Sequence, residues 1–153
     1  GKFKNAITLD INKFYELPDK IKEHELYLNE ENKSKKILTY CTGGVRCETA
    51  TTYLKQLGFQ NVYQLDGGLI KYGKEQNGKY FDGKCYVFDG RITKDINIEN
   101  PKKITKCIIC NIENDTIINC MNSLCDKHGT MCVNCNILMN GCCSEKCKNS
   151  GKN

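Results

Sequence analysis

Apolar positions in the first 94 residues follow two different spacings. Short apolar or β-branched runs, typical of buried strands, cover residues 6–9, 36–40 and 61–65. Apolar residues at helical spacing predict helical stretches over residues 12–15, 18–27, 48–57 and 69–75. Alternation of strand and helix is typical of a parallel sheet with helices on its faces. The pattern therefore predicts an α/β fold for this part of the chain.

A change of character after this region predicts a second part. Residues 86–88 form one more expected strand, which enters a turn at Asp89-Gly90. Residues 95–106 are polar and contain Pro101, as a linker does. Nine of the twelve cysteines then lie between Cys107 and Cys147. We therefore expect a domain over residues 1–94, a linker over 95–106 and a cysteine-rich module over 107–148.

Composition narrows the class of protein. A chain that is 39% hydrophobic and 27% charged has the balance of a folded protein rather than a disordered one. No apolar run approaches the roughly 20 residues that cross a bilayer, so we expect no membrane partner and a cytoplasmic location. The net charge of +5 is too small to be more than weak evidence for nucleic-acid binding.

The segment with the clearest chemistry joins the strand at residues 36–40 to the helix at 48–57. It reads Cys41-Thr42-Gly43-Gly44-Val45-Arg46-Cys47. Glycines let successive amide groups turn toward one point, a helix begins there, and Arg46 adds a full positive charge. These features should lower the pKa of Cys41, and a thiolate attacks or carries sulfane sulfur as a persulfide. We predict Cys41 and Arg46 as catalytic residues.

The rest of this segment is predicted to form an anion or persulfide loop, comprising Thr42, Gly43, Gly44, Val45 and Cys47. Cysteine phosphatases surround phosphate with Cys-x5-Arg, whereas the spacing here is Cys-x4-Arg, so the cradle is smaller. A plain Gly-Gly turn beside a buried cysteine is the alternative. Cys47 either resolves an oxidised Cys41 or simply packs in the core.

The cysteine-rich region contains four close pairs. They are Cys107 and Cys110, Cys120 and Cys125, Cys132 and Cys135, and Cys143 and Cys147, with Cys142 left over as the alternative to Cys143. Eight thiolates suit two tetrahedral Zn²⁺ sites, and closed sites of four thiolates are structural rather than catalytic. Identical spacing in the first and third pairs favours their sharing one ion, although sequential pairing stays open. A disulfide framework, or ligation by His128, is a further alternative.

Several strings resemble a known family. Residues 41–46 resemble the active-site loop of rhodaneses, and residues 1–7 resemble a Gly-His-Ile-x-Gly-Ala motif near the start of that domain, with Lys2 in place of the usual His. Residues 40–48, 62–68 and 86–92, with the cysteine-rich tail, are most similar to the tRNA uridine hydroxylase family. The resemblance implies a rhodanese-like parallel sheet flanked by helices, tRNA as partner and oxygen-dependent formation of 5-hydroxyuridine at the wobble position, with Cys41 essential.

The family also sets expectations outside this sequence. Its members carry a small α/β domain before the rhodanese unit, and a first rhodanese strand with an Asp-Val-Arg-Asn-x-x-Glu motif should precede Gly1, so we expect an N-terminally incomplete sheet. We find no organic cofactor motif. Two other functions stay open: a sulfurtransferase that takes sulfane sulfur from a small donor, and a non-catalytic zinc-stabilised interaction module.

Overall fold

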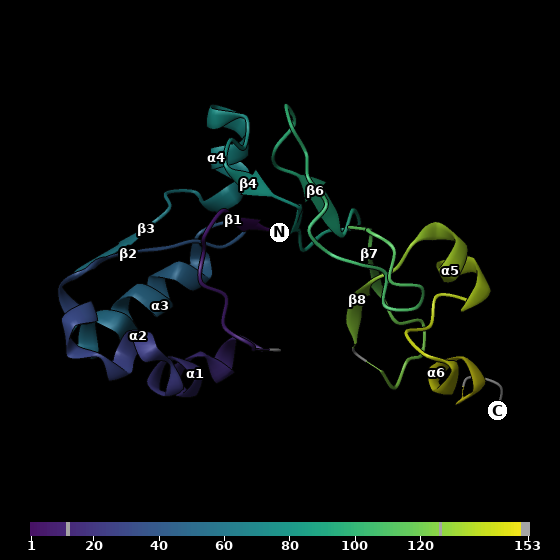
Figure 1. The fold of residues 1–153 in the computed structure, drawn as a ribbon, viewed down its shortest axis with the longest axis horizontal. Helices are drawn as coiled ribbons and strands as arrows, with labels where there is room; N and C mark the ends of the chain where they lie inside the picture. The colour runs from purple at the N-terminus through teal and green to yellow at the C-terminus, as the bar shows by residue number, and fades with distance from the viewer. Residues whose placement is uncertain (12, 126, 151–153) are drawn as a thin grey trace. The chain divides into compact units, whose positions relative to one another are not determined.

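The computed structural model describes residues 1–11, 13–125 and 127–150 (Figure 1). These residues pack into two compact units. One is Asn5–Gly78, and the other combines Gly1–Lys4 with Lys79–Asn153. Among the described residues, no helix has both the length and the apolar composition needed to cross a membrane.

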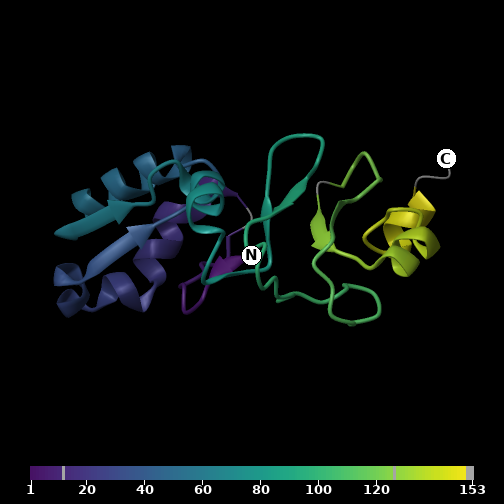
Figure 2. The same cartoon turned by 90° about the horizontal axis from the view of Figure 1, so that it is seen from above.

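The Asn5–Gly78 unit is built on a strand–helix–strand motif. Strand β2 (Lys36–Thr39) pairs in parallel with β3 (Asn61–Gln64), and α3 (Val45–Gln56) connects them (Figure 2). A parallel pair requires such a crossover, because the chain must return to the same end of the sheet. Helix α4 (Gly68–Gln76) follows β3. The predicted α/β class is confirmed here, with a parallel pair and helices in the expected order.

A small apolar core holds this unit together. The buried cluster contains Ile21 of α1 (Leu17–Glu23), Leu54 of α3, Val62 of β3, and Phe59 from the segment between α3 and β3. Figure 1 shows α1, α2 (Glu25–Leu28) and α3 on the same side of the two strands. The sheet therefore buries one face against these helices and positions the β2–α3 loop at its edge.

The predicted helical stretch before β2 is broken into short pieces. Its elements are the 3₁₀ helix η1 (Phe14–Glu16), α1, α2 and the 3₁₀ helix η2 (Glu30–Ser34). His24 is extended, with φ −86° and ψ 144°, and its Nδ1 accepts a 3.0 Å hydrogen bond from the amide of Leu26. His24 therefore ends one helix and caps the next, a role usually taken by short polar side chains. Residue 12, predicted as helical, lies outside the described residues.

The prediction of a strand over residues 6–9 is wrong. These residues form no strand, and Ile7 is 61% exposed. Leu9 nevertheless packs against the core cluster. An apolar run becomes a strand only where a neighbouring strand accepts its hydrogen bonds. None of the described strands pairs with this segment, so it follows the surface as an irregular stretch.

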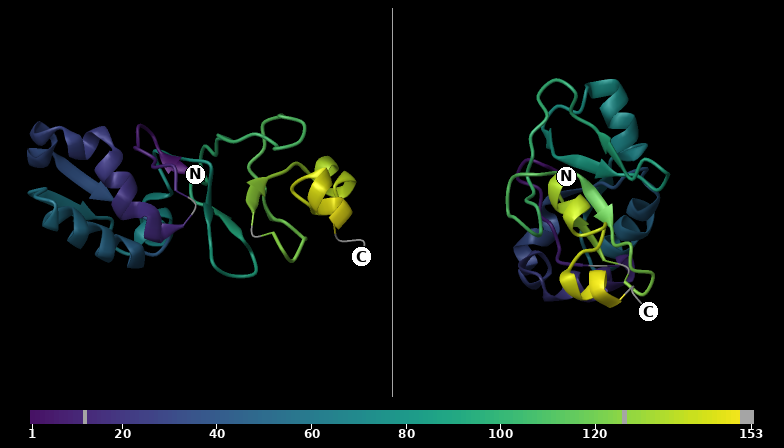
Figure 3. Two further views of the ribbon diagram at one scale, coloured as in Figure 1. Left: turned by 90° about the horizontal axis from the view of Figure 1, so that it is seen from below. Right: turned by 90° about the vertical axis from the view of Figure 1, so that its right-hand side faces the viewer.

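The other unit is made of short antiparallel pairs. Strand β1 (Lys2–Phe3) pairs with β4 (Phe81–Asp82), β5 (Lys84–Tyr86) with β6 (Thr93–Asp95), and β7 (Ile117–Asn119) with β8 (His128–Thr130). Two helices end the described chain, α5 (Val133–Leu138) and α6 (Glu145–Ser150), and they lie next to each other (Figure 3). The strand predicted at residues 86–88 is shifted toward the N-terminus and forms the β5–β6 hairpin.

The predicted linker is partly packed. Ile96 is 1% exposed and Asn97 is 9% exposed. The backbone amide of Gly83 also donates a 2.8 Å hydrogen bond to the carbonyl of Lys102. The two compact units therefore meet at residues 4/5 and 78/79, which differ from the predicted domain boundaries at residues 94 and 107. Those boundaries stay a prediction.

Candidate functional site

Cys41 lies where a parallel strand meets a helix. Strand β2 ends at Thr39, and α3 begins at Val45. The loop between them lies at the carboxyl end of the strand, the edge where open α/β sheets bind their ligands. Gly44 caps α3 with φ 94°, a left-handed conformation that glycine adopts without strain. The turn from strand into helix therefore needs a backbone conformation that favours glycine at this position.

Backbone amides of the loop surround the Cys41 sulfur. The amide of Gly44 donates to Sγ of Cys41 over 3.1 Å. The amides of Arg46 and Cys47 also help to lower the pKa of Cys41, and the amide of Cys47 donates a 3.0 Å hydrogen bond to the carbonyl of Gly44. Several amides pointing at one atom form an anion-binding nest at the start of a helix, where the helix dipole adds positive potential. The loop is thus built to stabilise negative charge on this sulfur.

The two thiols of the loop differ in acidity. Partial burial would raise the pKa of Cys41, but the hydrogen bond from the Cys47 side chain and those from the backbone amides outweigh it and hold the pKa below its usual value. Burial and the hydrogen bond to Cys41 raise the pKa of Cys47 to about 11. Cys47 is also only 2% exposed. Cys41 is therefore the more acidic thiol of the pair, and Cys47 is a buried thiol of higher pKa.

Arg46 and the remaining loop residues occupy the outside of this nest. The guanidinium Nη2 of Arg46 lies 3.5 Å from Oγ1 of Thr42. Val45 is 76% exposed, and a Cβ at Gly43 would meet no atom within 4 Å. The sequence predicted that the loop amides, the helix start and the charge of Arg46 together lower the pKa of Cys41. The largest lowering causes are the Cys47 side chain, which was not predicted in this role, and the backbone amides.

A second glycine turn supports the loop, and sequence reasoning assigned it no role at the site. The amides of Leu69 and Ile70 donate to the carbonyls of Cys41 and Thr42 over 3.0 and 3.1 Å. A Cβ on Gly68 would lie 2.6 Å from the Cys41 carbonyl oxygen and 2.7 Å from the Gly44 nitrogen. The start of α4 is therefore used to hold the Cys41 loop. The sequence feature that could have indicated this role is Gly67-Gly68, directly after the strand that pairs with β2.

The eight paired cysteines converge into two groups of four. Thiols of the first group lie within 4.8 Å of one another, and so do those of the second. The groups are Cys107, Cys110, Cys132 and Cys135, and Cys120, Cys125, Cys143 and Cys147. The first sequence pair thus meets the third, and the second meets the fourth. Each group could hold a metal ion.

The spacing of the sulfur atoms is informative. Cys110 and Cys132 have their sulfurs 3.7 Å apart, and the sulfur of Cys143 is 3.8 Å from that of Cys125 and 3.7 Å from that of Cys147. A disulfide requires about 2.0 Å. Four thiolates at about 2.3 Å from one ion in a tetrahedron have sulfurs about 3.8 Å apart. The donor chemistry and the spacing fit a tetrahedral thiolate site.

Cys142, the cysteine outside the four sequence pairs, and His128, the alternative ligand, lie outside both groups. Cys142 is buried, and its thiol donates to the carbonyl of Asn140 over 3.7 Å. Nδ1 of His128 lies 2.5 Å from Oδ1 of Asn119. Around the first group, Ile118, Met131 and Met139 form a buried apolar cluster with three of its cysteines. This cluster shields three of the four cysteines from water, whereas Cys110 is exposed.

Two family models match the chain. A rhodanese-like domain model matches residues 1–75, and a rhodanase C-terminal model matches residues 82–148. Together they cover both the Cys41 loop and the two cysteine groups. The chain belongs to the rhodanese-like family, in the form that carries this C-terminal region.

More specifically, the chain is similar over almost its whole length to proteins named tRNA uridine(34) hydroxylase. It is 51% identical to the one from Cytophaga hutchinsonii over 148 residues, which are 97% of this chain and 46% of that protein. It is 40% identical to the one from Chlamydia muridarum over 96% of this chain and 45% of that protein. With the one from Onion yellows phytoplasma it shares 42% identity, over 100% of this chain and 49% of that protein. The chain spans about half the length of these relatives.

Proposed function

We propose that the protein carrying this chain hydroxylates carbon 5 of the wobble uridine of tRNA with oxygen, and that Cys41 is its essential thiol. The names of relatives that are 40–51% identical support the reaction and the tRNA partner. The observation that carries the assignment of Cys41 is its sulfur, which accepts a 3.1 Å hydrogen bond from the amide of Gly44 at the start of α3.

The loop has one clear chemical capacity. Amide donors aimed at Sγ stabilise negative charge on that atom, whether it is a thiolate nucleophile or carries the terminal sulfur of a persulfide. Arg46, at the start of α3, supplies a permanent positive charge for an anionic group that approaches the loop. Thr42, Gly43, Gly44, Val45 and Cys47 complete this loop. Cys41 and Arg46 are accordingly the proposed catalytic residues.

Sulfur transfer is the second candidate function. The same nest would hold a Cys41 persulfide formed from a small donor such as thiosulfate, and the rhodanese-like family model over residues 1–75 favours this possibility. Both functions need the thiolate of Cys41. They differ in the product, which is a hydroxylated uridine in one case and a sulfur-bearing acceptor in the other.

The cysteine groups are proposed to hold two structural Zn²⁺ ions. One ion would be bound by Cys107, Cys110, Cys132 and Cys135, and the other by Cys120, Cys125, Cys143 and Cys147. Four thiolates leave no position for a reactive water, so the ions would stabilise the fold rather than take part in chemistry. A set of reduced thiols and a tRNA substrate both agree with a cytoplasmic location.

The two functions are separated by assaying one purified sample in two ways. Full-length protein is incubated with tRNA lacking the modification, and the nucleosides are analysed by mass spectrometry for 5-hydroxyuridine. In parallel, thiocyanate formation from thiosulfate and cyanide is measured. We expect hydroxylation with little sulfur transfer. Strong sulfur transfer without hydroxylation would reverse the ranking.

A further inference from the structure

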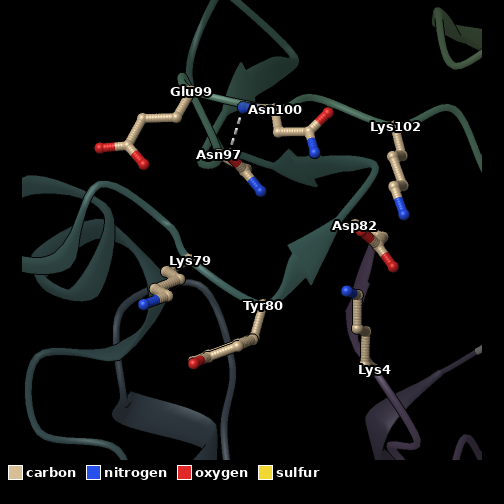
Figure 4. Close-up of a pocket in the computed structure, with 8 residues that line it drawn as sticks. All are labelled: Lys4, Lys79, Tyr80, Asp82, Asn97, Glu99, Asn100 and Lys102. Atoms are coloured by element: carbon tan, nitrogen blue, oxygen red, sulfur yellow. Dashed lines mark hydrogen bonds between the residues drawn. The ribbon is translucent and has the colours of Figure 1, made fainter.

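A pocket beside β4 brings three lysines and a tyrosine together. Its volume is about 260 Å³, and its lining includes Lys4, Lys79, Lys102 and Tyr80 (Figure 4). All four residues belong to the unit that contains β1 and β4. Pockets that enclose drug-sized ligands measure about 300–1,000 Å³. This one is therefore suited to a single small group or to one unit of a longer chain.

Tyr80 is held in an unusual position. Its φ is 69°, and its side chain is 58% exposed. A bulky residue at positive φ is rare and persists only where its surroundings fix it. Here the amide of Lys4 donates a 3.0 Å hydrogen bond to the Tyr80 carbonyl. Nζ of Lys79 lies 5.2 Å from the centre of the tyrosine ring. The backbone thus presents an aromatic ring together with a cation at the pocket.

The opposite side of the pocket supplies further positive charge. Figure 4 shows Lys4, Asp82 and Lys102 across the opening from Lys79 and Tyr80. Lys4 and Lys102 are exposed, and neither forms an ion pair with a carboxylate in the described part of the chain. With Glu99 and Asp82 as the acidic members, the lining has a net charge of +1. That charge matches one phosphodiester rather than a cluster of phosphates.

The floor of the pocket is preorganised. Asn97 is 9% exposed, and its Nδ2 donates to the carbonyl of Phe81 over 3.2 Å. Its Oδ1 accepts a 2.9 Å hydrogen bond from the amide of Asn100. Phe81 is fully buried, with its ring 5.4 Å from that of Phe3. The wall that faces a ligand therefore rests on a packed core and does not need to form upon binding.

We infer that this pocket binds one nucleotide of an RNA strand, with the phosphate against Lys4 and Lys102 and the base stacked on Tyr80. Proteins bind single-stranded nucleic acid by combining cations that follow the backbone with aromatic rings that stack on bases. Asp82 and Glu99 can accept hydrogen bonds from a ribose 2′-hydroxyl, which DNA lacks. The inference rests on the proposed function, since it takes RNA as the substrate.

The test measures binding of a fluorescent single-stranded oligoribonucleotide to the full-length protein by anisotropy at several salt concentrations. Lys102→Gln should weaken binding and reduce the slope of log affinity against log salt by about 0.7, the value for one lost phosphate contact on a single strand. Lys103→Gln removes the same charge one residue away, outside the pocket lining, and should leave the slope unchanged. Equal slopes for the two variants would overturn the inference.

Two variants of Tyr80 test whether its ring stacks on a base. Tyr80→Phe keeps the ring and should bind as the unchanged protein does. Tyr80→Asn, whose side chain tolerates positive φ, removes the ring and should weaken binding about tenfold. Unchanged affinity for Tyr80→Asn would contradict stacking at this position.

Two further outcomes separate this inference from others. If uridine 5′-monophosphate binds in a Lys102-dependent way while the oligonucleotide does not, the pocket serves a free nucleotide and the RNA assignment fails. If tRNA is hydroxylated but RNA binding is independent of Lys102, only this inference fails. If RNA binding depends on Lys102 but uridine is never modified, the proposed function fails and the pocket assignment stands.

Discussion

The backbone amide of Gly44 donates a 3.1 Å hydrogen bond to Sγ of Cys41. Gly44 itself has φ 94°, and this rotation about its N–Cα bond directs the chain that follows into α3 while its amide faces the sulfur. One backbone conformation thus links the turn of the chain to the acidity of the thiol. The predictions for the loop follow from this link.

Gly44→Ala should disturb the loop through conformation rather than through crowding. A Cβ at this position would meet its nearest atom at 3.7 Å, an ordinary contact. A left-handed conformation costs an alanine about 1–2 kcal/mol. We expect a loss of that size in the free energy of unfolding, measured by urea denaturation, and slower alkylation of Cys41. Gly43→Ala is the control, because its Cβ meets nothing within 4 Å, and it should change both quantities little.

Gly68→Ala should be more damaging than the same change at another left-handed glycine. Its Cβ would lie 2.6–2.7 Å from backbone atoms of Cys41, Thr42 and Gly44, which cannot move without distorting the loop. Gly58→Ala carries similar conformational strain at φ 92°, but its nearest neighbour is the flexible side chain of Lys33 at 3.6 Å. We expect Gly68→Ala to lower the free energy of unfolding by about 1–3 kcal/mol more than Gly58→Ala does. Equal losses by urea denaturation would show that the turn does not support the loop.

Alkylation should distinguish the two loop thiols by pH. The pKa of Cys41 lies below its usual value, so its thiolate forms at lower pH than that of an unperturbed cysteine. Its rate of reaction with iodoacetamide should therefore rise and level off at lower pH, whereas Cys47, with a pKa of about 11, should stay unreactive near neutrality. Peptide mass spectrometry reports the labelled residue. Preferential labelling of Cys47 would contradict the assignment of the thiolate.

Removal of the Cys47 thiol should shift the pH dependence of Cys41 alkylation. Cys47→Ala deletes the side-chain donor to Cys41, so the pKa of Cys41 should rise and its alkylation curve should shift to higher pH. An unshifted curve would mean that the backbone amides alone set the acidity of Cys41.

Metal content should distinguish two adjacent cysteines. Cys143 belongs to a group of four thiols, and Cys142 does not. We expect about two Zn²⁺ per chain by elemental analysis of the reduced protein. Cys143→Ala should lose about one of the two ions, whereas Cys142→Ala should keep both. A zinc-free preparation, or equal loss in both variants, would contradict the proposed ligand sets.

The sequence was most informative where local chemistry dictates structure. A β-rich run, a Gly-Gly loop and a helix can be predicted around Cys41 because strand pattern, turn residues and helical spacing all agree there. The role of Gly68 could not be predicted, because it depends on two loops that meet only after β2 and β3 pair. The segment over residues 6–9 was mispredicted for the same reason, since an apolar run does not identify its own partner strand.

The break at His24 shows a different limit. Apolar spacing continues through residues 18–27, yet the side chain of His24 accepts the hydrogen bond from the amide of Leu26 and starts a new helix. Periodicity does not reveal such competition between side chain and backbone. The cysteine groups are the opposite case, because pair spacing alone favoured the arrangement in which the first pair meets the third.

We propose that the Cys41 thiolate is required for wobble uridine hydroxylation. This requirement is tested most directly by expressing the full-length protein, unchanged or as Cys41→Ser, in cells that lack this modification. Serine nearly preserves the side-chain volume but supplies neither a thiolate nor a sulfur carrier at neutral pH. Mass spectrometry of tRNA nucleosides should show 5-hydroxyuridine restored by the unchanged protein and absent with Cys41→Ser at equal expression and melting temperature. Full restoration by Cys41→Ser would show that the Cys41 thiol is not required for hydroxylation.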